Sequence, residues 1–93
     1  MNKDEVANKL FEDVNMIIKA SFYNATLNYN NQQNKWIIRG IFNLEKVMNT
    51  SEIFQIFENT GFQVSTPKLK ETRRITVTKD YKDLNPSHKH NEV

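Results

Sequence analysis

The two histidines, His88 and His90, are the side chains best suited to acid–base catalysis or metal binding near neutral pH, and both lie close to the C-terminus. A hydrolytic triad needs its base within reach of a nucleophile, and a metal site needs ligands beyond one His-x-His pair. No apolar pattern surrounds these residues. We interpret 85–93 as a polar tail and expect no metal site there.

Carboxylates are spread over two segments with helical patterns, but acid–base catalysis needs them in a cleft with separated pKa values. Helix caps and solvated faces account for all of them: Glu5, Glu12, Asp13, Glu45, Glu52 and Glu58. The chain has no cysteine and only two glycines, which excludes thiolate nucleophiles, zinc fingers and a glycine-rich phosphate loop. We therefore predict a protein that is not an enzyme and binds no cofactor.

Basic residues are concentrated between positions 66 and 84, where six basic and three acidic residues give a charge of +3, against +2 for the whole chain. In a strand over 73–81, Arg74, Thr76 and Thr78 would share one face, and arginine and hydroxyl side chains commonly contact phosphates. Charges on an edge strand also prevent aggregation, so a solvated edge is the alternative. The candidate nucleic-acid-binding residues are Lys68, Lys70, Arg73, Arg74, Lys79 and Lys82.

The segment 35–43, KWIIRGIFN, predicts a strand that is apolar on both faces. Trp36, Ile38 and Phe42 share one face and Ile37 and Ile41 the other. If helices cover the first face, then Ile37, Arg39 and Ile41 lie on an open face, where they would favour a dimer or a docked protein. The alternatives are a curled sheet or coverage by the loop 67–72.

The rest of the chain divides into periodic segments. Apolar residues at helical spacing predict a helix over 3–20, and period-two alternation predicts strands over 21–29, 62–66 and 73–81. In the first of these strands, Tyr23, Ala25, Leu27 and Tyr29 should share a face. The polar run 30–34 predicts the loop of a hairpin. Gly40 indicates a bulge or a close approach of another backbone.

A second helix is predicted to begin after Asn49, whose spacing to Glu52 is that of a capping box. The predicted buried stripe is Ile53, Phe54, Ile56 and Phe57, and Gly61 should end the helix with Phe62 folding back. The segment 44–48 reads as a short helical turn or as an earlier start of this helix.

These elements predict one α+β domain over 1–84 in the order α-β-β-α-β-β. We expect a four-stranded antiparallel or mixed sheet with two helices packed on one face. The second and third strands could form the split βαβ unit of ferredoxin-like folds. No segment is apolar over the ~18 residues that a membrane span requires, and the N-terminus is charged, so we expect a cytoplasmic protein.

The function expected from these features is that of a small protein-binding regulator or inhibitor. Its partner would be another protein or a second copy, as a homodimer, contacted through Ile37, Arg39 and Ile41. A phage or mobile-element origin fits the abundance of asparagine and lysine, which A/T-rich codons produce. The alternative is a nucleic-acid-binding module that uses the basic C-terminal hairpin. Nothing indicates a small-molecule substrate or a membrane partner.

Overall fold

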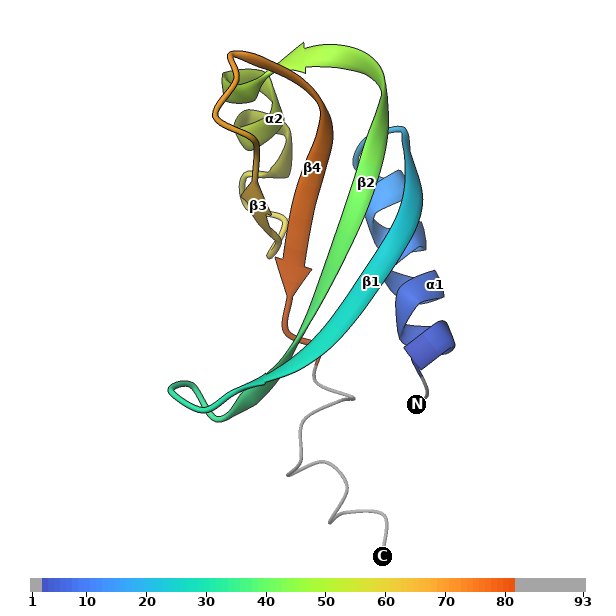
Figure 1. Cartoon of the computed structure of the whole chain (residues 1–93), viewed down its shortest axis with the longest axis vertical. Helices are drawn as coiled ribbons and strands as arrows, with labels where there is room; N and C mark the ends of the chain where they lie inside the picture. Colours follow the sequence, from blue (N-terminus) through green and yellow to red (C-terminus); the bar gives the residue numbers. More distant parts are fainter. Residues whose placement is uncertain (1–2, 82–93) are drawn as a thin grey trace, which may run out of the picture.

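The computed structural model describes residues 3–81, which form a four-stranded antiparallel sheet and two helices (Figure 1). The predicted α+β class is confirmed, and the sheet is antiparallel rather than mixed. None of the helices within this range is long and apolar enough to cross a membrane. The predictions for Lys82, His88, His90 and the tail 85–93 lie outside the described residues. The elements are α1 (Lys3–Asn15), β1 (Ala20–Asn30), β2 (Lys35–Asn49), α2 (Thr50–Phe57), β3 (Gln63–Ser65) and β4 (Glu71–Lys79).

The strands lie in the order β1-β2-β4-β3. Both β2 and β3 pair antiparallel with β4, so they run parallel to each other with β4 between them. Helix α2 connects them, which is the arrangement of a split βαβ unit. The sheet therefore has β1 and β3 at its edges, and β2 and β4 are paired on both sides.

The predicted hairpin of β1 and β2 is confirmed. In its loop, the side-chain oxygen of Asn30 accepts hydrogen bonds from the backbone N–H groups of Gln32 and Gln33, and Asn34 has a φ of 55°. Asparagine tolerates this left-handed conformation better than most residues do. The loop sequence thus fixes where the chain turns.

The prediction of a helical turn over 44–48 is wrong, because β2 continues to Asn49. Its pairing with β4 is irregular between Asn43 and Met48 and then resumes, with Met48 opposite Thr72. Leu44 and Met48 are both buried in the core. Backbone pairing and burial outweigh the local helical preference of the sequence LEKVM.

Helix α1 ends at Asn15, so the predicted helix over 3–20 is five residues too long. The backbone N–H groups of Ile17 and Ile18 both bond to the carbonyl of Val14, and the chain turns there into β1. The helix buries Val6, Leu10 and Val14 completely. These three residues lie one helical turn apart, which gives a single stripe toward the core.

Gly40 lies where α1 and the sheet meet. A Cβ atom at this position would overlap the side chain of Leu10 and lie 2.7 Å from Cε2 of Phe42. The residue pairs regularly with Ala25 on one side and Val77 on the other, so there is no bulge. The prediction of a bulge or of a close approach by another backbone is wrong, because the groups that approach Gly40 are the side chains of Leu10 and Phe42.

Helix α2 begins after Asn49 as predicted, and the Asn49 side chain accepts a hydrogen bond from the Ser51 backbone at 2.8 Å. The helix ends at Phe57, before the predicted stop at Gly61, which has a φ of 87°. Phe62 does fold back, with its ring centroid 6.2 Å from that of Phe57. The predicted four-residue stripe is wrong in part, because Ile53 and Phe57 are buried whereas Phe54 and Ile56 are 49% and 37% exposed.

Candidate functional site

One face of the sheet carries mostly polar side chains. Along β2, Ile38, Gly40 and Phe42 are buried, so Ile37, Arg39 and Ile41, which alternate with them, point to the opposite face. Strand register aligns the neighbours of these residues into rows across the sheet. We name this surface the open sheet face and define it by Asn24, Thr26, Asn28, Ile37, Arg39, Ile41, Asn43, Gln63, Ser65, Arg74, Thr76 and Thr78. All of these residues are exposed or half-buried.

Two complete rows cross the four strands of this face. The first is Thr26–Arg39–Thr78–Gln63 and the second is Asn24–Ile41–Thr76–Ser65. Hydroxyl and amide groups therefore surround one arginine and one isoleucine at the centre. The defined face contains no carboxylate, so its formal charge comes from Arg39 and Arg74 alone.

Arg39 lies at the centre of the open sheet face. Three shallow hollows meet at this residue: one toward Asn24 and Thr26, one toward Ser65 and Thr76, and one toward the hairpin loop. Its side chain is exposed, and it does not belong to the ion pairs found within residues 3–81, Lys9–Asp13 and Lys35–Asp80. Its guanidinium donors are thus accessible to a ligand.

Arg74 is held at the margin of the same face by an aromatic neighbour. Its Nη1 donates a hydrogen bond of 3.3 Å to the hydroxyl of Tyr23. The prediction that Tyr23 shares a face with Ala25 is wrong, because the β1–β2 register shifts between Phe22 and Asn24. A bulge reorients the side chain of the extra residue, and no glycine in β1 signals it in the sequence.

Ile37 and Ile41 are half-buried on either side of Arg39. Ile37 lies opposite Asn28, and Ile41 lies between Asn24 and Thr76. The hollows that these two isoleucines line include no residue of the loop 67–72. Both side chains offer apolar area next to the exposed guanidinium.

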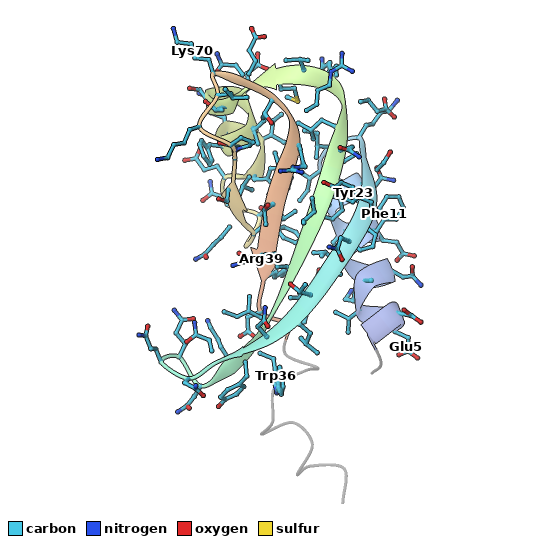
Figure 2. All side chains as sticks on the ribbon, viewed as in Figure 1. Glu5, Phe11, Tyr23, Trp36, Arg39 and Lys70 are labelled. Carbon is cyan, nitrogen blue, oxygen red and sulfur yellow. The ribbon has the colours of Figure 1, made fainter. Side chains whose placement is uncertain are left out.

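The structure does not bring the predicted nucleic-acid-binding residues together. Lys68 and Lys70 are exposed in the loop before β4, and Lys70 lies at one end of the molecule, away from Arg39 (Figure 2). Arg73 is exposed beside Arg74 near the start of β4. Lys79 is six residues, roughly 20 Å, further along this strand.

Lys79 also belongs to the other side of the sheet. It lies opposite Ile38, and its ammonium is 4.8 Å from the centroid of the Phe62 ring and 5.4 Å from that of Tyr81. These are cation–π distances. Of the described basic residues in the predicted set, only Arg74 is part of the open sheet face.

Among residues 3–81, no cluster of three His, Cys, Asp or Glu residues could hold a metal ion. Asp80 is a feature that the sequence did not reveal. Its Oδ1 is buried without a hydrogen-bond partner, and its Oδ2 lies 3.9 Å from the ammonium of Lys35. Two charged residues far apart in sequence meet there because β4 ends beside the hairpin.

Comparison with known proteins adds no assignment: the sequence matches no protein family model, no curated protein and no solved structure. The function must therefore be inferred from the geometry of the chain.

Proposed function

We propose that this protein is a small non-enzymatic regulator or inhibitor that binds another protein through the open sheet face. One observation carries the proposal: the exposed Arg39, with no ion-pair partner within residues 3–81, lies between the half-buried Ile37 and Ile41 on a face whose defined residues include no carboxylate. Arginine and apolar side chains at the centre of a polar surface are the composition of protein interfaces.

The proposal assumes that both helices pack on the other face of the sheet, so that the open sheet face stays uncovered. Leu10 of α1 and Phe57 of α2 belong to a single hydrophobic cluster that also contains Phe42 and Val77. Phe42 and Val77 alternate along their strands with the residues of the open sheet face. A common core on one side of the sheet supports this arrangement.

The charge of the face indicates the chemistry of the partner. Two guanidinium groups on a face whose defined residues include no carboxylate fit a partner surface that is acidic where it meets Arg39 and Arg74. Hydroxyl and amide groups from all four strands would supply the surrounding polar contacts. The planar arginine fork can bind a carboxylate through two hydrogen bonds.

The test is an affinity pull-down from the native host with three baits: the wild-type protein, Arg39→Glu and Lys19→Glu. Lys19 is exposed just before β1, outside the open sheet face, so the two variants carry the same change of charge. A partner should be retained by the wild type and by Lys19→Glu and lost with Arg39→Glu. Retention by Arg39→Glu would contradict the proposal.

Nucleic acid is the second candidate partner, because Arg39 and Arg74 share one face with the hydroxyls of Thr26, Thr76 and Thr78. Such side chains contact phosphates in many complexes. A salt titration of binding to mixed-sequence DNA and RNA separates the two candidates. Two phosphate contacts would give a slope of log affinity against log salt of roughly −2, whereas no measurable binding removes this candidate.

A further inference from the structure

The two edges of the sheet differ in how they are protected. Strand β3 has three residues and is followed shortly by Pro67 and Lys68, whereas β1 has eleven residues. The β1 sequence, ASFYNATLNYN, contains no charged residue, no proline and no glycine. Natural proteins usually protect a long edge strand with charge, proline or short length, because its free backbone groups can pair with another chain. Strand β1 has none of these devices.

Within β1, the segment Ala25–Asn30 is the free part of the edge. The register shift between Phe22 and Asn24 interrupts the first half of the strand, and the second half extends beyond α1 (Figure 1). The pairing of β2 with β4 begins at Ile38, so at the hairpin end β1 and β2 form a two-stranded ribbon. Such a ribbon is marginally stable in water unless another strand or a helix joins it.

We propose that Ala25–Asn30 pairs antiparallel with the same segment of a second copy, which gives a two-fold symmetric dimer with one continuous sheet. A symmetric interface places residues of the same segment opposite each other, so any charged residue would face like charges nearby. Strand β1 contains none. In the dimer, threonine and asparagine side chains of the two copies would lie opposite one another on one face of the sheet. Ala25, Leu27 and Tyr29 of the two copies would lie opposite one another on the other face. Self-pairing therefore fits this edge better than pairing with a charged partner strand.

The dimer has a geometric consequence. The two-fold axis would be perpendicular to the sheet, so each residue stays on its own face in both copies. The two open sheet faces would then lie on the same side, each with its Arg39. The inference rests on the edge strand and does not depend on what the open sheet face binds.

The proposal is tested by sedimentation equilibrium on three proteins: the wild type, Thr26→Lys/Asn28→Lys and Thr76→Lys/Thr78→Lys. All four positions belong to the open sheet face, but only the first pair lies on the edge strand. The wild type and the Thr76/Thr78 variant should dimerise, and lysines on the edge should raise the dimer dissociation constant at least ~10-fold. A wild type that stays monomeric at all concentrations, or equal effects of both variants, would overturn the proposal.

Cysteine cross-linking gives an independent reading should the lysine variants unfold, because the natural chain has no cysteine. Two residues directly opposite each other lie on the same face, so their positions in β1 differ by an even number. In a two-fold symmetric pair of identical strands, one residue must therefore lie opposite the same residue of the second copy. Directly opposite Cα atoms lie within disulfide range. Single cysteines at Thr26, Leu27 and Asn28 should therefore include one that forms a covalent dimer on oxidation, whereas Ser65→Cys on the opposite edge should not. Cross-linking of Ser65→Cys alone would overturn the proposal.

Discussion

Among single residues, Gly40 determines how closely α1 approaches the sheet. Gly40→Ala would place a methyl group against the Leu10 side chain and 2.7 Å from Cε2 of Phe42. Both neighbours are fully buried, so neither can move into solvent. Overpacking of this kind typically costs ~1–3 kcal/mol. We predict a loss of that size in the free energy of unfolding, measured by urea denaturation.

A double variant identifies the contact responsible. Leu10→Ala alone should cost ~2–5 kcal/mol through the cavity it leaves. If the new methyl at position 40 occupies part of this cavity, Gly40→Ala/Leu10→Ala will lose less stability than the two single variants together. Additive losses would show that the approach of Leu10 is not what requires glycine at this position.

Tyr81, two residues after the end of β4, links this strand to α1. Its ring is buried, and its hydroxyl donates a hydrogen bond of 2.9 Å to Oδ2 of Asp13. Burial, this hydrogen bond and the charge of Asp13 raise the pKa of Tyr81 well above its ordinary value. The folded protein therefore retains a proton at alkaline pH that the unfolded chain releases above pH ~10, so stability should fall as the pH rises through this range.

The prediction is that the free energy of unfolding of the wild type falls more steeply above pH ~10 than that of Tyr81→Phe, which cannot ionise there. Below this pH, the variant should be less stable by about 1 kcal/mol, because it lacks the hydrogen bond to Asp13. Urea melts at several pH values measure both effects. Parallel pH profiles for the two proteins would mean that Tyr81 titrates normally in the fold.

At the scale of elements, α2 provides a matched pair of aromatic residues. Phe57 is 3% exposed and packs against Phe62, whereas Phe54 is 49% exposed. Phe57→Ala should cost ~3–5 kcal/mol in a urea melt, and Phe54→Ala, at an exposed position, less than about 1 kcal/mol. A loss of similar size for both would mean that α2 buries a broader face than its orientation indicates.

How much of each element the sequence predicts depends on where the signal comes from. The cap at Asn49 and the hairpin loop were predictable, because their signals are local hydrogen bonds and backbone conformations. The strand continuation over 44–48 was not, because it depends on the pairing of Leu44 with Ala20 and of Met48 with Thr72, which are distant in sequence. The orientation of α2 was also not predictable, since Ile53, Phe54, Ile56 and Phe57 form an apolar stripe wider than the face that a helix of eight residues buries.

At the scale of the whole molecule, the register of the sheet brings together on one face two groups of residues that the sequence patterns place on separate strands. Alternation along single strands was enough to place Ile37, Arg39 and Ile41 together, and likewise Arg74, Thr76 and Thr78. Only the pairing of β2 with β4 shows that both groups share one face, with Ile41 opposite Thr76. The bulge that brings Tyr23 to Arg74 left no signal in the sequence, whereas alternation along β4 is enough to place Lys79 on the side opposite Arg74, Thr76 and Thr78. The central residues of the candidate site were therefore predictable, whereas its extent across the four strands was not.

This outline leads to a prediction that compares two pairs of charge reversals. Arg39→Glu/Arg74→Glu and Lys68→Glu/Lys70→Glu change the net charge equally, and all four side chains are exposed, so both variants should fold. Only the arginines belong to the open sheet face. If that face binds the partner, reversing the arginines should weaken binding at least ~30-fold, as expected when interface arginines of ~2 kcal/mol or more are lost.

The lysine reversal should change the binding free energy by less than about 1 kcal/mol, because peripheral charges contribute little. Isothermal titration calorimetry at two salt concentrations measures both variants against the wild type. The opposite ranking would move the site to the loop before β4. Equal losses that disappear at high salt would show that overall charge attracts the partner without a defined contact. A loss confined to the arginines and retained at high salt is the result that places the contact on the open sheet face, because desolvated arginine contacts are screened far less than exposed charges are.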